Sequence, residues 1–348
     1  MAGIIYSKSS GLNNAMIGKL ETPLKMIIEH ESDACAKKNG VCKALFNIEK
    51  SKKFGETLVA NSDFDVFSAA EEGAGAENDT IRETYKKVIE HIQFMKEFTI
   101  TAQMMEDANY GVAADAKRRA EQFVRAYYKT MDKICSAALI NGTKAAATFA
   151  KANLDLACYD GLPLFHKAHK FSTKKYKSNT QANYFYHNGF SAKADDVEAM
   201  LNVLANKMRN MRDENGEIME YIADTVILPG NRPQFEALVK KVCGSERTAG
   251  TANNDINIQY GNWNLVVLPD WQTTGDKFMI MSSEANKNLA GNMFFNRVPL
   301  TVNHWVDNHT GNYIWNGRCR FGVGFGTYKH ILLCENAESN ANAEAITL

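Results

Sequence analysis

Several features that would place a chain in a familiar class are missing here. Only six prolines occur in 348 residues, none lies between residues 24 and 162, and no Pro/Gly/Ser-rich linker divides the chain. No apolar run approaches the length of about 18 residues that a membrane span needs. Forty Lys and Arg balance forty Asp and Glu, which excludes a protein that coats nucleic acid through bulk positive charge. The N-terminus lacks the charged and apolar segments of a secretory signal.

Cysteine is present but follows no known pattern. The seven cysteines are scattered, their number is odd, and no CxxC pair occurs. These features predict free thiols in a reducing compartment, most of them acting as small apolar core residues.

The composition is globular, with 45% apolar and 23% charged residues. Apolar positions stepping by three and four predict a long helix over 111–139, roughly 40 Å in length. Further helices are predicted over 191–212, with Ser191 as N-cap, and over 234–243 after Pro233. A short buried strand over 225–228 and mostly antiparallel strands over 257–334 complete an α+β class.

Charge is unevenly distributed along the chain. Residues 1–53 hold nine Lys against five acids and read as an extended arm with one helix and no core. Residues 54–80 hold seven acids and no Lys or Arg, and Gly73–Ala76 marks a turn. Residues 81–101 fit both a helical and a strand period, and the second half, 93–101, favours a strand by its β-branched and aromatic content. A long hairpin is therefore expected, and because it is poor in core residues it must pack against another surface. The residues from Glu335 onward read as a loose tail.

Few residues suggest chemistry. His166 and His169 have a spacing that can chelate a metal, with Asp160 or Cys158 as a further ligand, but neighbouring lysines would repel a cation. A metal-dependent hydrolase is therefore a minor alternative. Gly322, Gly324 and Gly326 precede a predicted strand and not a helix, so close backbone approach is a better interpretation than a phosphate loop. His304 and His309 flank Asp307 in an aromatic strand region, where structural packing is favoured.

A second basic segment lies at 161–194, where six Lys alternate with aromatic residues and no acid occurs. Single-stranded nucleic acid could bind there by stacking and charge. Equally, the basic segment and the acidic hairpin could meet between neighbouring subunits. The predicted inter-subunit contacts are Asp63, Phe64, Asp65, Phe67, Glu71 and Glu72 on the hairpin and Lys167, Lys170, Lys174, Lys175 and Lys177 on the basic segment.

The order of elements resembles the major capsid protein of tailed bacteriophages, the Hong Kong 97-type fold. The segment 161–169, GLPLFHKAH, is similar to a stretch of head subunits related to phage Mu. The segment 224–229, DTVILP, after a helix and a turn, is similar to a strand of the same family. The resemblance covers roughly residues 55–334.

The resemblance implies five regions: an N-terminal arm (1–53), an extended loop (54–103), a peripheral domain with its spine helix (104–190), an axial domain (191–312), and return strands with a tail (313–348). It implies a structural protein without enzymatic activity or cofactor, and without a membrane partner. Such a protein assembles into hexamers and pentamers of an icosahedral head around double-stranded DNA, in the virion, after assembly in the host bacterial cytoplasm. An encapsulin-like nanocompartment shell is an alternative with the same architecture.

Partners follow from the same resemblance. No charge-rich coiled coil precedes the arm, so a separate scaffolding protein is expected, together with a portal and a decoration protein. Residues 54–80 contain no Lys, so no covalent crosslink between subunits is carried over.

Overall fold

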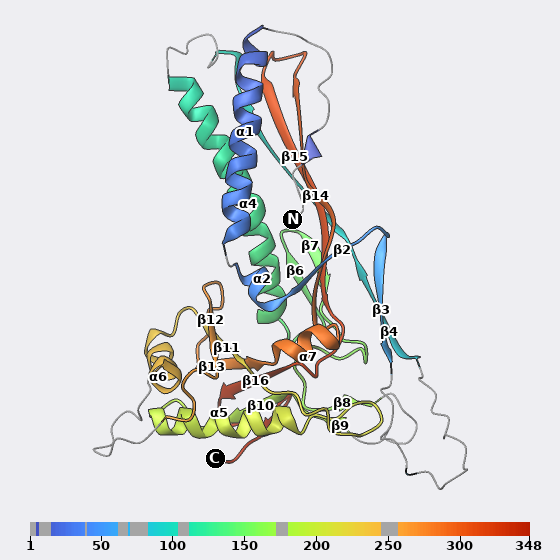
Figure 1. Ribbon diagram of the computed structural model, residues 1–348, viewed down its shortest axis with the longest axis vertical. Coiled ribbons are helices and arrows are strands. Elements are labelled where there is room, and N and C mark those ends of the chain that lie inside the picture. The colour runs from blue at the N-terminus through green and yellow to red at the C-terminus, as the bar shows by residue number, and fades with distance from the viewer. Residues whose placement is uncertain are drawn as a thin grey trace.

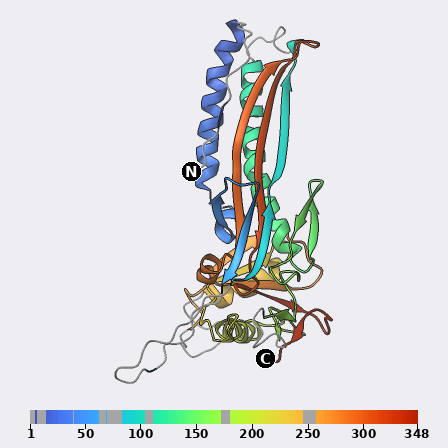
Figure 2. The same ribbon diagram turned by 90° about the vertical axis from the view of Figure 1, so that its right-hand side faces the viewer.

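The computed structural model describes residues 5–6, 15–38, 40–61, 69, 83–103, 111–171, 180–244 and 257–348. The molecule has a tall body of long helices and long strands that stands on a broader base (Figure 1). Figure 2 shows the body as two layers, with helices α1 and α4 along one face of the long strands. Among the described residues, no helix is long and apolar enough to cross a membrane.

Helix α4 (Gly111–Ile140) is the main helix of the body and confirms the helix predicted over 111–139. Ala116, Ala120, Phe123, Ile134 and Ala138 recur at helical spacing and are buried. Helix α1 (Ala15–Lys37) packs beside it. The Ser32 and Tyr128 hydroxyls are 2.9 Å apart across this contact, and Arg125 Nε donates to Glu31 at 2.6 Å.

The body sheet is built on two long antiparallel strands, β14 (Asn292–Val306) and β15 (Tyr313–Phe325). Strand β5 (Ile92–Ile100) pairs with β15, which confirms the strand predicted there, while β1 (Ile5–Tyr6) and β2 (Asn47–Lys50) pair with β14. Aromatic side chains stack across β5 and β15: Phe98 on Trp315 at 5.3 Å and Phe94 on Phe321 at 4.9 Å between ring centroids. These pairs fix the register of the sheet.

The N-terminal region differs from the prediction of an arm without core residues. Its helix is present, but α2 (Val41–Leu45) and Phe46, which follows it, also join the main core. Cys42, Leu45 and Phe46 are buried there. This apolar run is too short to show a helical or strand period, so the sequence alone did not reveal its burial.

The base contains a six-stranded sheet in the order β12-β11-β13-β16-β10-β17. These strands span Asn264–Leu268, Thr225–Pro229, Lys277–Met281, Ile331–Asn336, Tyr184–His187 and Glu344–Ala345. Helices α5 (Ala194–Arg209) and α6 (Pro233–Gly244) pack on it through a second apolar core, and α7 (Ser283–Asn288) precedes β14. The predicted helix after Pro233 and the buried strand at 225–228 are both confirmed.

Three details of the base differ from the predictions. β11 pairs with β12, and β10 with β16, in parallel, so the late strands are mixed and not uniformly antiparallel. Ser191 is not an N-cap, because its hydroxyl donates to Asp276 Oδ2 at 2.7 Å and α5 begins three residues later. The C-terminal segment is not a loose tail, since β17 pairs with β10 and Ile346 is buried.

Two small hairpins follow α4 in the chain and precede α5. β6 (Ala146–Phe149) pairs with β7 (Ala152–Asp155), and β8 (His169–Lys170) pairs with β9 (Thr180–Gln181). All seven cysteines are free and six are buried, as predicted.

Candidate assembly surfaces

The predicted hairpin is present. β3 (Gly55–Asn61) pairs in antiparallel register with β4 (Glu83–Glu90), and β4 continues through His91 into β5 of the body sheet. The hairpin leaves the body on the side away from α1 and α4 (Figure 1). The predicted contact residues Asp63, Phe64, Asp65, Phe67, Glu71 and Glu72 lie outside the described residues, as does the Gly/Ala turn.

The base of the hairpin is packed tightly onto the body. Ile89 is buried with Met293 and Phe295 in a small separate apolar cluster. Glycines of β15 make this approach possible, because a Cβ at Gly322 would lie 2.7 Å from the Glu90 carbonyl oxygen and one at Gly324 would lie 2.8 Å from Ile89 Cδ1. The glycines therefore permit close backbone approach, as predicted, and do not form a phosphate loop.

Polar contacts reinforce the same junction. The Ser51 hydroxyl donates to Glu56 Oε1 at 2.7 Å and lies 2.8 Å from His91 Nε2. Lys87, almost fully buried, pairs with Asp155 of β7. Burial, together with the nearby Arg320 guanidinium, lowers the pKa of His91. The junction thus holds a neutral imidazole, and the hairpin is fixed at its root.

The hairpin also exposes apolar side chains along its length. Phe54, which precedes β3 at the root and lies beside Arg320 of β15, is 70% exposed, Val88 is 50% exposed and Val59 is 40% exposed. A two-stranded ribbon that exposes such residues is marginal by itself and is stabilised by contact with another surface.

Of the basic contact residues predicted, two are described. Lys167 and Lys170 are both exposed, beside and within β8. Lys174, Lys175 and Lys177 lie outside the described residues. The pairing of this segment with the acidic hairpin of a neighbour therefore stays a prediction.

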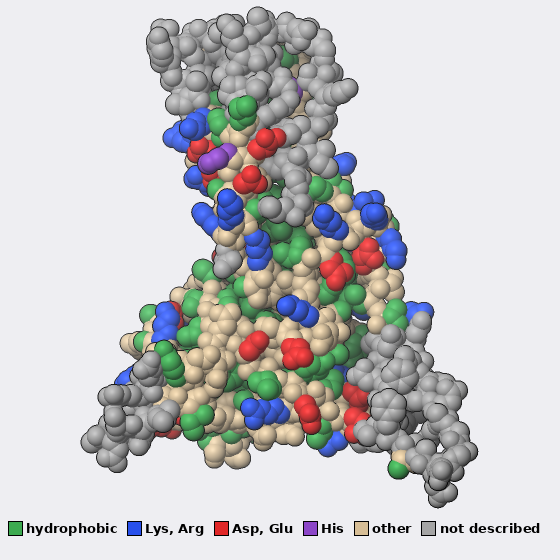
Figure 3. Space-filling model, viewed as in Figure 1, with side chains coloured by type: hydrophobic (Ala, Val, Ile, Leu, Met, Phe, Trp, Pro, Cys, Tyr) green, Lys and Arg blue, Asp and Glu red, His purple; other side chains and the backbone are tan. Residues whose placement is uncertain are grey.

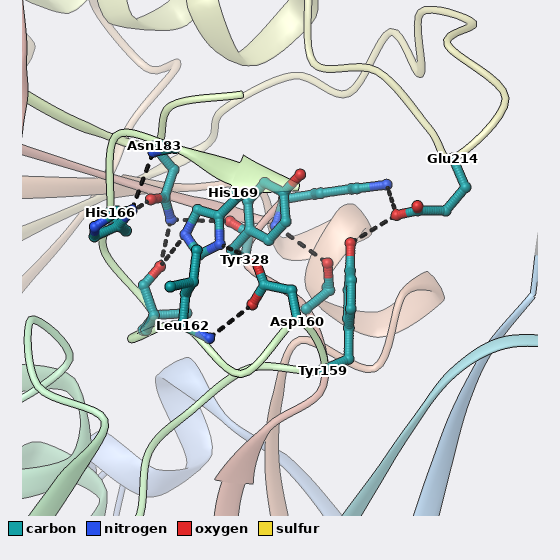
Figure 4. A network of polar contacts seen from close by, with 12 residues as sticks. Tyr159, Asp160, Leu162, His166, His169, Asn183, Glu214 and Tyr328 are labelled. Carbon is teal, nitrogen blue, oxygen red and sulfur yellow. Dashed lines mark hydrogen bonds and ion pairs between the residues drawn. The ribbon is translucent and has the colours of Figure 1, made fainter. Parts of the chain in front are cut away.

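The candidate metal ligands belong to a buried structural network (Figure 4). His169 Nδ1 lies 2.7 Å from Asp160 Oδ2, and both side chains are almost fully buried. The His169 ring stacks on Tyr328 with 3.7 Å between centroids. Burial disfavours the ionised form of Asp160, but hydrogen bonds from His169 and from the Leu162 amide outweigh it and hold the carboxyl pKa below its usual value.

A buried ion pair extends the same network. Lys329 Nζ and the Tyr159 hydroxyl each lie 2.7 Å from Glu214 Oε1. The Lys329 and Glu214 side chains are only 6% and 4% exposed. Asn183 contributes hydrogen bonds to the carbonyls of Leu164, Tyr328 and Ile331. The network ties a loop of the base to the turn between β15 and β16 (Figure 4).

This geometry leaves no open site for a metal. His169 and Asp160 satisfy each other, and burial raises the pKa of the Cys158 thiol well above its usual value. Within the described ranges, no group of three or more His, Cys, Asp or Glu side chains could hold a metal ion. The hydrolase alternative finds no support here.

The other candidates for chemistry are also structural. Asp307 accepts hydrogen bonds from the His309 amide at 3.1 Å and the Thr310 hydroxyl at 2.6 Å, which closes the turn between β14 and β15. The His304 ring stacks against Trp315 at 6.2 Å between centroids.

Comparison with known proteins identifies the family. The family model described as phage capsid protein matches residues 85–333. The chain belongs to this family. It is therefore a structural protein of the virion capsid, and it works by associating with its own copies.

A solved capsid structure shows the same fold, and two further structures are similar at lower scores. The capsid of the cyanophage P-SCSP1u is similar with a TM-score of 0.51 and 9% identity, over 87% of this chain and 89% of that one. The structure from Mycobacterium phage Patience is similar with a TM-score of 0.49 and 14% identity, over 98% and 95% of the two chains. The virus-like particle from Pyrococcus furiosus has a TM-score of 0.49 and 9% identity, over 90% and 98%. No curated protein sequence matches the chain.

The predicted Hong Kong 97-type capsid fold is thereby confirmed. The finer similarity to phage Mu head subunits stays a prediction.

Proposed function

We propose that this capsid protein forms the hexamers and pentamers of an icosahedral phage head that encloses double-stranded DNA, and that it has no catalytic role. The observation that carries the proposal is the hairpin β3–β4, which is anchored by the buried side chains of Ile89 and Lys87 but leaves Val59 and Val88 exposed. A neighbouring subunit would cover these residues. Many modest contacts of this kind add up to a stable shell through multivalency.

We also propose a division of the chain into five regions. The arm is residues 1–53, the extended loop 54–103, the peripheral domain 104–190, the axial domain 191–312, and the return strands with the C-terminal segment 313–348. The pairing of β14 with β15 across the boundary at 312 supports grouping β14 with the peripheral elements within this proposal.

The contacts proposed between subunits are Asp63, Phe64, Asp65, Phe67, Glu71 and Glu72 on the loop and Lys167, Lys170, Lys174, Lys175 and Lys177 near β8. A separate scaffolding protein, a portal, a decoration protein and non-specific contact with packaged DNA complete the proposed partners. Assembly would take place in the cytoplasm of the host bacterium.

Charge reversal on the loop tests the contact. The variant Glu71→Lys/Glu72→Lys should lower the yield of shells at least tenfold, because like charges then meet across the subunit contact. The control Glu217→Lys/Glu338→Lys makes the same change of net charge at exposed positions of the base. Shell yield is measured by sedimentation and electron microscopy. Equal yields from the loop variant and the wild type would remove the loop from the assembly contacts.

A further inference from the structure

A basic groove lies on the helical face of the body. It is about 510 Å³ in volume and is enclosed by the end of α1, by α2, by α4 and by the Pro269–Asp270 loop of the base. Its floor is apolar, formed by Val41, Ile48, Tyr128 and Met131. This groove was not predicted from the sequence, because its walls come from three separate segments.

Five cationic side chains line the groove. Arg125, Lys129 and Lys133 follow one another at every fourth position of α4, which gives a row about 12 Å long with roughly 6 Å between neighbours. Lys38 and Lys43 line it from the segment around the end of α1 and α2. Figure 3 shows Lys and Arg side chains gathered over this part of the body.

The acids of the groove are already engaged. The Asp132 carboxylate accepts the Cys42 amide at 3.0 Å and so caps the start of α2. Asp270 pairs with Lys133 at 3.3 Å, and Glu31, beside the groove, binds Arg125.

Two lysines keep their charge available. Lys38 and Lys129 are exposed, and among the described residues no carboxylate lies within ion-pair distance of either. The Lys43 ammonium donates a hydrogen bond to the Ala36 carbonyl near the end of α1. A carbonyl carries no full negative charge, so this contact does not neutralise the lysine. The lining of the groove thus holds five cations against two carboxylates, those of Asp132 and Asp270, in a chain whose total charge is zero.

We infer that this groove binds the phosphate backbone of duplex DNA, and that the face bearing α1 and α4 points to the interior of the shell. The inference rests on the proposed function, since it requires a shell that encloses DNA. A cleft lined by one sign of charge with apolar walls focuses the electrostatic field and concentrates counter-ions. Duplex DNA offers one negative charge per roughly 1.7 Å of its axis, so it can satisfy the cations of both walls at once.

The alternative occupant of the groove is an acidic peptide, of which the chain itself offers residues 62–80 with six acids. Six carboxylates spread over nineteen residues give a much lower linear charge density than a duplex. Contact through phosphates also needs no base-specific group, and the ammonium and guanidinium donors that line the groove are sufficient for it.

Fluorescence anisotropy of unassembled wild-type protein with a labelled 20-base-pair duplex tests the inference over a range of salt concentrations. The variant Lys38→Gln/Lys129→Gln should bind at least tenfold more weakly at low salt. The slope of log affinity against log salt should fall by about two, because two phosphate contacts are lost. Lys193→Gln/Lys241→Gln, at exposed positions of the base, is the matched control and should bind as the wild type does.

Four results would overturn the inference. The first three are no duplex binding by the wild type, an unchanged salt slope in the groove variant, and an equal loss of affinity in the control variant. The fourth is that binding of a peptide of residues 62–80 depends on Lys38 and Lys129, whereas binding of the duplex does not depend on them. Circular dichroism checks folding, and the single variant Lys129→Gln replaces the double variant if needed. Shell formation is measured separately, so wild-type shells with an insensitive groove refute only this inference, whereas absent shells refute the proposed function.

Discussion

Breaking the buried pair between Lys329 and Glu214 should destabilise the protein strongly. In Lys329→Met the Glu214 carboxylate, 4% exposed, loses its ammonium partner and keeps the Tyr159 hydroxyl at 2.7 Å. Removing one partner of a buried ion pair costs about 3–5 kcal/mol. The double variant Lys329→Met/Glu214→Gln removes both charges and keeps an acceptor for Tyr159, so it should lie within about 2 kcal/mol of the wild type. Glu214→Gln alone should be destabilised to a similar extent as Lys329→Met.

Urea unfolding of the unassembled protein, followed by tryptophan fluorescence, gives the four free energies of this double-mutant cycle. The predicted coupling energy is at least about 4 kcal/mol in magnitude, with the double variant more stable than either single variant. Equal slopes of the unfolding free energy against urea confirm that all four variants unfold over the same surface. A loss below about 1 kcal/mol for Lys329→Met, or additive effects of the two changes, would refute the reasoning that this pair locks base to body.

Three further predictions follow from single sites. Burial lowers the pKa of His330 to about 3. The stability that the neutral ring provides is therefore complete above pH 6.5 and is lost as the pH falls towards 3, by up to roughly 5 kcal/mol. In His330→Gln, the free energy of unfolding should change less with pH across that window. Gly326→Ala should cost about 2 kcal/mol or more, since its Cβ would lie 2.3 Å from the Ala290 carbonyl oxygen, while Gly244→Ala, with nothing within 4 Å, should leave the thermal midpoint unchanged. Ile89→Ala should cost about 2–4 kcal/mol by urea unfolding and slow assembly, because it removes the apolar root of the hairpin.

The sequence predicted the elements that carry a strong local period. Helix α4 was evident because Ala116, Ala120 and Phe123 repeat at helical spacing, and β5 because apolar residues alternate along it. The hairpin was expected from two strand-like limbs around a Gly/Ala turn. Each of these signals lies within one continuous segment.

Features made by distant segments were not predictable in this way. The stacking of His169 on Tyr328 and the pairing of Lys329 with Glu214 depend on tertiary proximity, so His169 appeared as a metal candidate when it is a core residue. The basic groove was not predicted for the same reason, since Lys38 follows the end of α1 whereas Lys129 lies on α4. The short run around Leu45 was placed in an arm because only packing against α4 reveals its burial.

The measurement that tests the central claim most directly is negative-stain electron microscopy of the protein expressed alone, together with size-exclusion chromatography. The account predicts closed shells, tubes or ring-shaped capsomers, and a peak far larger than a monomer. A small monomer or dimer at high concentration, even when the gene is co-expressed with its scaffolding protein, would contradict the account.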